Sequence, residues 1–220
     1  MNNEVNGMLF AKSLILLIFS RKVNRIVNRT RVIGISGKKG SGKTYLVRNF
    51  RQNIIGTPWA SKYILEIALA DAIKDVMVLL HGWNRTQLDE LEYKEDKKNS
   101  IYGMTPRQHL QIFGDWGRNI DKDFWVNVVR KQIEYKKADY VFVPDVRYEN
   151  EARFIRENGI IIHVERKGIL NNDKHPSENG IEIHENDLVF QNDEPGIEKF
   201  MRFMLEHRER IEGKKNDPIA

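Results

Sequence analysis

Short apolar segments of strand type alternate with longer amphipathic segments of helical period along most of this chain. Five apolar runs have the length of strands: residues 32–35, 63–70, 140–145, 160–164 and 188–191. Helical spacing of apolar residues predicts helices over residues 42–54, from 71, from 105, 123–137, 149–158 and 197–211. The run 63–70 is too densely apolar for a solvated edge and suits a parallel strand covered on both faces. This alternation favours one α/β domain, and 220 residues are enough for a substantial core.

The first strand leads into a glycine-rich loop that matches the phosphate-loop pattern G-x-x-x-x-G-K-T. Glycines allow a tight turn whose N–H groups point at phosphate oxygens, and the next helix directs its N-terminus at the same anion. Lys43 can reach the β- and γ-phosphates, and the Thr44 hydroxyl can ligate Mg²⁺. The alternative is an ordinary strand–helix turn. The predicted nucleotide site consists of Gly37, Lys38, Lys39, Gly40, Ser41, Gly42, Lys43 and Thr44.

Charged residues follow two other predicted strands, at the carboxyl edge of the sheet where ligands bind. Asp71 and Lys74 follow the run 63–70. They either face substrate or serve as a helix N-cap and a solvated lysine. Asp145 ends the run 140–145, like the second acidic motif of phosphate-loop proteins, whose aspartate lies near Mg²⁺. Arg147 follows two residues later, and we expect it to point toward the same phosphates.

A Thr-Pro pair at 105–106 supplies the N-cap and the first residue of the next predicted helix. Arg107 and Gln111 fall on the packing side of this helix, where such residues are unusual. Together they can hold a phosphate and a base edge, and Arg118 follows farther along. The preceding residues 81–104 are polar and charge-rich, so we expect a mobile excursion or short helices there, with the charge run KEDKK at 94–98 as a solvated face.

Composition narrows the functional classes. The chain has no cysteine, which excludes disulfides, thiol catalysis and zinc–thiolate sites, and fits a cytoplasmic location. Residues 1–31 contain six basic side chains and one acidic one, which equals the net charge of +5 of the whole chain. The remaining residues are balanced in charge. The main body therefore lacks the basic footprint of a nucleic-acid-binding protein.

The N-terminal residues differ from the rest of the chain. Residues 8–19 are strongly apolar but fall short of the ~20 that span a bilayer as a helix. A signal peptide fits poorly, because no basic residue precedes the run and no small-x-small site follows it. Residues 8–29 are either an amphipathic helix that contacts a membrane or a partner weakly, or a non-core extension from an upstream start codon. We expect an extension over 1–29, a phosphate-loop domain over 30–212 and a loose tail over 213–220.

Several longer segments add to the phosphate loop. They are ALADAIKDV at 68–76, TPRQHLQIFGDWGR at 105–118, DFWVNVV at 123–129 and VPDVRYENEARFIRENG at 143–159, then IIHVER, DKHPSENGI and NDLVFQND. With these segments the chain, from Lys43 to Asp193, resembles the phosphate-loop deoxynucleoside monophosphate kinases of bacteriophages, the T-even type especially. The combination of TPRQ-L-Q-x-x-G, PDVR-x-x-NE and H-x-SE-x-G is far more specific than the loop alone.

The resemblance implies a nucleoside-monophosphate-kinase fold with five parallel strands and helices on both faces. It implies transfer of the γ-phosphoryl group of ATP, with Mg²⁺, to a deoxynucleoside 5′-monophosphate for viral DNA synthesis. The partners implied are small nucleotides rather than nucleic acid. A host-cytoplasmic location follows if the chain is viral, and a homodimer is compatible with the resemblance.

The resemblance also implies roles for individual residues. The monophosphate site would be lined by Lys74, Arg107 and Gln111. Asp71 is added to it because it follows a strand at the same edge of the sheet. Glu178 would lie near substrate in a lid-like loop over 167–186. The catalytic groups would be Lys43, Asp145, Arg147 and Arg118. Thr44 and Asp145 would lie at the Mg²⁺ ion.

Two other classes fit the phosphate loop. Another small-molecule kinase, such as a phosphomevalonate or dephospho-coenzyme-A kinase, would share the fold and the loop. The second class is a nucleotide-dependent switch or binding module. A GTPase of that class would carry an N-K-x-D guanine motif, which is absent, and the D-x-x-G element occurs only at 193–196.

Overall fold

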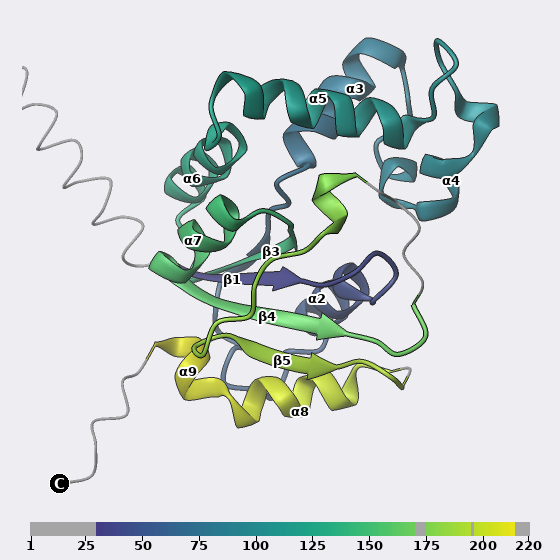
Figure 1. Cartoon of the computed structure of the whole chain (residues 1–220). Helices are drawn as coiled ribbons and strands as arrows, with labels where there is room; N and C mark the ends of the chain where they lie inside the picture. Colours follow the sequence, from purple (N-terminus) through teal and green to yellow (C-terminus); the bar gives the residue numbers. More distant parts are fainter. Residues whose placement is uncertain (1–29, 170–174, 195, 214–220) are drawn as a thin grey trace, which may run out of the picture.

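The computed structural model describes residues 30–169, 175–194 and 196–213. These residues form a five-stranded sheet in the order β2-β3-β1-β4-β5, and all neighbouring strands are parallel (Figure 1). The strands are β1 Arg31–Ser36, β2 Ile64–Glu66, β3 Tyr140–Val146, β4 Gly159–Glu165 and β5 Leu188–Gln191. Each predicted apolar run overlaps one of these strands, so the predicted α/β fold with a parallel sheet is confirmed.

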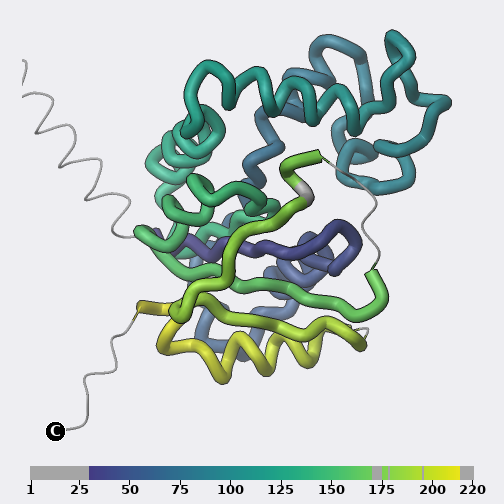
Figure 2. Tube along the Cα trace, in the orientation of Figure 1, coloured from purple at the N-terminus to yellow at the C-terminus, as the bar shows by residue number. Residues whose placement is uncertain are grey.

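Helices cover both faces of the sheet. They are α2 Lys43–Gln52, α3 Asp71–His81, α4 Leu91–Glu95, α5 Pro106–Ile120, α6 Phe124–Lys136, α7 Glu149–Asn158, α8 Glu198–Glu206 and α9 Arg208–Glu212. On one face α2, α8 and α9 bury Phe50, Phe200 and Ile211 in one core cluster. On the other face α6 and α7 bury Ile133 and Ile155 in a second cluster. Helices α3, α4 and α5 lie together, on the side of the molecule away from α8 and α9 (Figures 1 and 2).

The segment between α3 and α5 has a small core of its own. Met77, Trp83 and Leu88 are buried in a third cluster, and Leu88 is fully buried. Short 3₁₀ turns at Gln87–Asp89 and Lys97–Asn99 flank α4. The short helices expected over 81–104 are therefore present, and Glu95, Lys97 and Lys98 of the charge run are exposed. Apolar burial holds this segment against α5.

The second strand is shorter than expected and lies at the edge of the sheet. Its surroundings are still apolar on both sides, because Ile64 belongs to the first core cluster and Leu65 packs against the second. The chain leaves the sheet after Ile67, whose N–H still bonds to the Phe142 carbonyl oxygen. The N–H group of Ala68 bonds to the Asp71 side chain, and those of Leu69 and Ala70 bond to the Asp145 side chain. A side chain from the neighbouring strand thus captures the donors that would have extended β2.

Local capping signals are largely correct. Thr105 and Gln108 form a capping box at the start of α5, with Pro106 as the first helical residue. Helix α7 ends before Gly159 as predicted, and this glycine begins β4. A Cβ at Gly159 would lie 1.6 Å from the Val32 carbonyl oxygen, so the close approach of β1 and β4 requires glycine.

Two helix predictions need correction. Ala70, not Asp71, is the N-cap of α3, and Asp71 is the first helical residue. The helix predicted over 197–211 is divided at His207 into α8 and α9. The extension over 1–29 and its contacts, the loop residues 170–174 and the tail beyond Gly213 lie outside the described residues. In the described part of the chain, no helix is both long and apolar enough to cross a membrane.

Candidate active site

The loop after β1 folds as a cradle. Gly37, Gly40 and Gly42 have φ of 145°, 81° and 95°, which L side chains rarely adopt. A Cβ at Gly37 would lie 2.2 Å from the Val164 carbonyl oxygen, so the loop sits directly on the end of β4. Asn192 Nδ2 donates to the Ser41 carbonyl oxygen at 2.7 Å and fixes the other side of the loop. This glycine-dependent geometry leaves backbone N–H groups available for an anion at the start of α2.

Lys43 and Ser41 place polar groups inside this cradle. Lys43 Nζ donates to the carbonyl oxygens of Gly37 and Lys38, the latter at 2.8 Å. Ser41 Oγ is buried and has no hydrogen-bond partner among the described residues. A buried hydroxyl without a partner is costly, and a bound phosphate would supply the missing acceptor.

One cavity of about 400 Å³ joins this loop to the group formed by α3, α4 and α5. Most of the sequence-predicted site residues line it: Lys39, Gly40, Gly42, Lys43, Thr44, Asp71, Lys74, Arg107, Gln111, Arg118, Asp145 and Arg147. Gly37, Lys38 and Ser41 build the loop but do not line the cavity. The side chain of Glu178 lies outside the described residues, although its backbone ends a 3₁₀ turn. Residues from four separate segments of the sequence therefore meet in one space.

Asp145 connects the end of β3 to the start of α3. Its two carboxylate oxygens accept N–H bonds from Leu69 and Ala70 at 2.8 and 2.9 Å. Burial raises the pKa of this carboxyl group, although the N–H bond from Ala70 and the charge of Lys74 act in the opposite direction. The role of Asp145 at a metal ion stays a prediction, because its carboxylate is already engaged in positioning α3.

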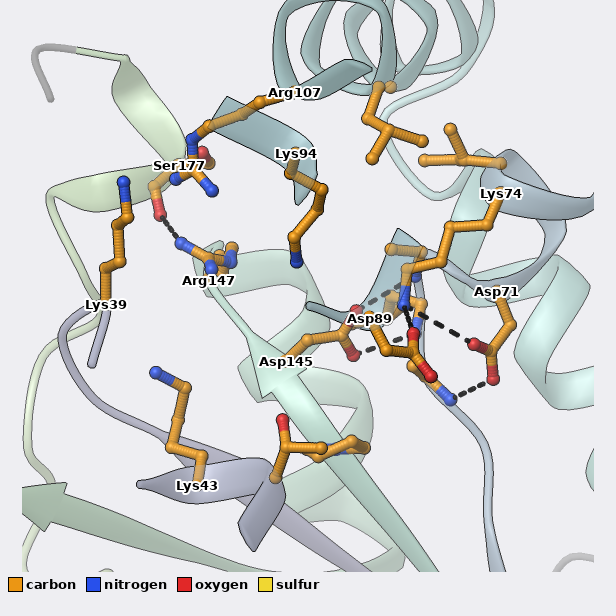
Figure 3. A pocket seen from close by; sticks show the side chains of 18 of the residues that line it. Lys39, Lys43, Asp71, Lys74, Asp89, Lys94, Arg107, Asp145, Arg147 and Ser177 are labelled. Carbon is orange, nitrogen blue, oxygen red and sulfur yellow. Dashed lines mark hydrogen bonds and ion pairs between the residues drawn. The ribbon is translucent and has the colours of Figure 1, made fainter. Parts of the chain in front are cut away.

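A network of charges joins α3 to the segment that follows it. Asp71 accepts from the Ala68 N–H at 2.8 Å and from Arg85 at 2.6 Å. Lys74 Nζ lies 2.7 Å from an oxygen of Asp89 (Figure 3). Burial disfavours ionisation of Asp89, but the hydrogen bonds and charges of Lys74, Arg48 and Arg85 hold its pKa at about 2. Lys74 therefore lines the cavity as an ion-paired side chain and is not a solvated lysine.

Glu95 connects the two sides of the cavity. Its Oε1 atom lies 2.6 Å from Lys39 Nζ in the phosphate loop and 3.3 Å from Arg107 Nε in α5. The loop predicted to hold the phosphate donor ATP and the helix predicted to hold the monophosphate acceptor thus share one carboxylate. An anion that draws either cation away also alters the contacts of the other.

Arg118 and Arg147 converge from α5 and from the end of β3. Arg147 donates to the Ser177 carbonyl oxygen at 3.1 Å (Figure 3). The Arg118 guanidinium lies 4.2 Å from the centre of the Tyr148 ring. Arg118 Nε and the Tyr148 hydroxyl are buried and have no hydrogen-bond partner among the described residues. Two unsatisfied polar atoms in a cavity wall are the expected mark of a ligand-binding surface.

The sequence interpretation missed several residues of this site. Glu151 accepts the N–H groups of Arg147 and Tyr148 at 2.8 and 3.1 Å and so fixes the backbone that carries both side chains. Asp89 comes from the charge-rich segment 81–104, and Lys94 begins its run KEDKK, which was expected to be a solvated face. The only available signal was the position of Glu151 in the string PDVRYENE, four residues after Arg147.

Comparisons of the sequence with known proteins find one family and several relatives. A sequence model of the family described as deoxynucleotide monophosphate kinase matches residues 90–202. A protein of Acanthamoeba polyphaga mimivirus named "Putative deoxynucleotide monophosphate kinase" is 31% identical over 185 residues, which cover 77% of this chain and 91% of that protein. The deoxynucleotide monophosphate kinase of Enterobacteria phage T4 is 37% identical over 81 residues, 34% of this chain and 33% of that protein. The one from Escherichia phage RB69 is 38% identical over 77 residues, 33% of this chain and 32% of that protein.

Proposed function

The chain belongs to the deoxynucleotide monophosphate kinase family, and we propose that it transfers the γ-phosphoryl group of ATP, bound with Mg²⁺, to a deoxynucleoside 5′-monophosphate. The products are ADP and the deoxynucleoside diphosphate. One observation carries the proposal: the phosphate loop and a group of cations from α3 and α5 line the same cavity. A cavity with an anion cradle at one side and cations at the other suits two phosphate-bearing substrates that meet between them.

ATP binds in the loop from Gly37 to Thr44. The loop fits triphosphate oxygens, because its glycines have positive φ and the buried Ser41 hydroxyl lacks a partner within the described residues. Lys43 exchanges its loop carbonyl partners for the β- and γ-oxygens when ATP is bound. The N-terminus of α2 adds the positive end of its dipole at the same point.

The oxygen ligands that the cavity offers fit an Mg²⁺ ion that keeps waters and phosphate oxygens, and not an ion ligated by the protein alone. Among the described residues, no group of three or more His, Asp or Glu side chains could hold a metal. Mg²⁺ keeps several waters and takes phosphate oxygens together with one or two protein ligands. Thr44 lines the cavity and supplies one such ligand, and Asp145 acts at the ion directly or through water. When bound, Mg²⁺ neutralises charge on the β- and γ-oxygens.

The acceptor occupies the side of the cavity formed by α3 and α5. Arg107 and Lys74 hold its 5′-phosphate, while Gln111, one turn after Arg107, contacts the base edge. Asp71 holds the ribose side through the polar network that it forms with Arg85, and Glu178 contacts substrate from the loop above. These positions direct the acceptor phosphate toward the phosphate loop.

Phosphoryl transfer needs positioned charge more than a covalent protein group. Arg147 and Arg118 stabilise the charge that develops on the transferred group. The Glu151 carboxylate holds the backbone of Arg147, and the Tyr148 ring supports the Arg118 guanidinium. Closure of the segments 81–104 and 175–186 over the cavity excludes water, so that the acceptor and not water receives the phosphoryl group.

The destination of the γ-phosphate tests this proposal. With γ-labelled ATP, Mg²⁺ and a deoxynucleoside monophosphate, we expect the label in the diphosphate product. The Arg107→Met variant should raise KM for the acceptor more than KM for ATP. The matched control is Arg153→Met, which removes a solvent-exposed arginine of α7 and should behave as wild type. Label that appears in inorganic phosphate regardless of acceptor would instead identify an ATPase.

The remaining assignments concern the surroundings of the enzyme. Its partners are small nucleotides and not nucleic acid. A host-cytoplasmic location follows if the chain is viral. The oligomeric state is open between monomer and homodimer, and residues 8–29 are a candidate for a weak accessory contact to a membrane or partner. Light scattering tests the dimer, and deletion of residues 1–29 tests the accessory role, since soluble activity should remain.

A further inference from the structure

Lys94 is the one lysine of the run KEDKK at 94–98 that lines the cavity. Its side chain points from α4 into the space that Arg147 also faces (Figure 3). Lys97 and Lys98, in the same run, are solvent-exposed. Because α4 packs beside α5 and the turn Gln87–Asp89, the folded segment covers Lys94 in part and leaves Glu95, Lys97 and Lys98 exposed.

The surroundings of Lys94 are predominantly cationic. Burial lowers the pKa of its ammonium group to about 8, and the charges of Lys74, Arg107 and Arg147 add to this effect. The Asp89 carboxylate opposes this lowering of the Lys94 pKa, and its oxygens accept hydrogen bonds from Lys74, Arg48 and Arg85. Within the described residues, the side chain of Lys94 forms no hydrogen bond or ion pair, and its backbone N–H donates to the Glu90 carbonyl oxygen.

A partly buried ammonium group without a side-chain partner is unfavourable, and more so beside three other cations. A bound anion would remove this cost for all of them together. Lys94 enters from the same side of the cavity as Arg107, whereas Lys43 lies across from both (Figure 3). The cations that act on Lys94 are those of the acceptor side and of Arg147, and Lys43 is not among the strongest influences on it.

We propose that Lys94 binds the 5′-phosphate of the acceptor deoxynucleotide, beside Arg107, and makes this subsite selective for a dianionic phosphate. The inference rests on the proposed function and adds to it a residue of α4. A phosphate monoester loses its second proton near pH 6, so the acceptor is a dianion at neutral pH. That charge keeps Lys94 protonated in the complex, while the free enzyme loses the proton near pH 8.

The variant Lys94→Met tests the proposal, and Lys97→Met is its matched control. Both remove one positive charge from the same run, but Lys97 is exposed and does not line the cavity. We expect Lys94→Met to raise KM for the acceptor roughly 10- to 100-fold, the effect of losing a charged hydrogen bond, with KM for ATP nearly unchanged. Lys97→Met should match wild type. An acceptor KM within twofold of wild type in Lys94→Met would refute the proposal.

Two further readouts distinguish binding from a structural role. Lys94→Met removes an unpaired, partly buried charge, so its melting temperature should equal or exceed that of wild type, whereas loss of a structural contact would lower it. In wild type the acceptor KM should rise between pH 7.5 and 9. Lys94→Arg keeps its charge throughout this range and should abolish that rise. A rise that persists unchanged in Lys94→Arg would assign it to another group and contradict the proposal.

Equilibrium binding separates this inference from the proposed function. Calorimetric titration with a deoxynucleoside monophosphate, with inorganic phosphate as competitor, does not depend on turnover. Weaker binding to Lys94→Met than to wild type supports the Lys94 site even if the chain transfers no phosphoryl group. Equal binding by both proteins, in a wild-type enzyme that is active, refutes the Lys94 site and leaves the kinase assignment intact.

Discussion

Glu151 should make the stability of this protein depend on pH in a direction opposite to that of an ordinary ion-paired carboxylate. It is 4% exposed, and burial raises its pKa from 4.5 to about 7, with the charge of Asp145 adding to the effect. The N–H bonds from Arg147 and Tyr148 oppose this rise without cancelling it. The folded chain therefore holds a proton that the unfolded chain releases between pH 4.5 and 7.

The sign and the size follow from this difference. As pH rises through that window, the free energy of unfolding falls by about 1.4 kcal/mol per unit, or about 3 kcal/mol in total. Above pH 7 the contribution is constant. Glu151→Gln keeps an oxygen for the two N–H groups but cannot ionise. It should therefore lose this slope. Between pH 5 and pH 8 its free energy of unfolding should fall by about 2.5 kcal/mol less than that of wild type, because pH 5 already lies inside the window.

Urea unfolding followed by tryptophan fluorescence at pH 5 and pH 8 measures this difference. Trp59, Trp83 and Trp125 are all buried and report loss of the fold. The additional N–H of the glutamine shifts stability at both pH values equally, so the change between them is the informative quantity. Glu157→Gln, which replaces an exposed carboxylate on the same helix, should leave that change at its wild-type value. If Glu151→Gln also retains the wild-type change, the buried carboxyl group does not control it and the reasoning is wrong.

Three further substitutions test separate parts of the account. Lys43→Ala should abolish turnover while circular dichroism stays native, and substantial residual activity would remove the phosphate loop from the mechanism. Asp89→Asn should lower the free energy of unfolding at pH 7 by about 1–2 kcal/mol, because three cations lose a shared carboxylate, and wild-type stability would contradict this. Gly117→Ala places a Cβ 2.7 Å from the Trp125 ring and should cost about 1–3 kcal/mol in urea unfolding. In the double variant Gly117→Ala/Trp125→Phe, the smaller ring should recover part of that loss. If the losses of the two single variants simply add in the double variant, there is no clash between the new Cβ and the Trp125 ring.

Features with local signals could be predicted from the sequence. The phosphate loop depends on glycines at fixed spacing, and its conformation is set within eight residues. The same holds for the start of α5, where Thr105 and Gln108 satisfy each other's backbone groups. Arg107, Gln111 and Arg118 were correctly expected on one side of a helix, since helical spacing fixes that side.

Features that depend on distant partners could not be predicted. Nothing near Asp145 in the sequence indicates that its oxygens bond to Leu69 and Ala70, more than seventy residues away. Those bonds also explain why β2 is shorter than its apolar run. Lys94 and its exposed neighbour Lys97 have the same chemistry and differ only in how α4 packs on α5. Burial of one lysine among several is a tertiary property, and a charge run alone indicates solvation.

The proposed reaction is tested most directly by a coupled ADP-release assay with ATP, Mg²⁺ and each deoxynucleoside and ribonucleoside monophosphate in turn. We expect strong stimulation by one or a few deoxynucleoside monophosphates, with formation of the diphosphate. ATP turnover that no monophosphate changes would contradict phosphoryl transfer to a nucleotide, and so would the absence of turnover with every acceptor.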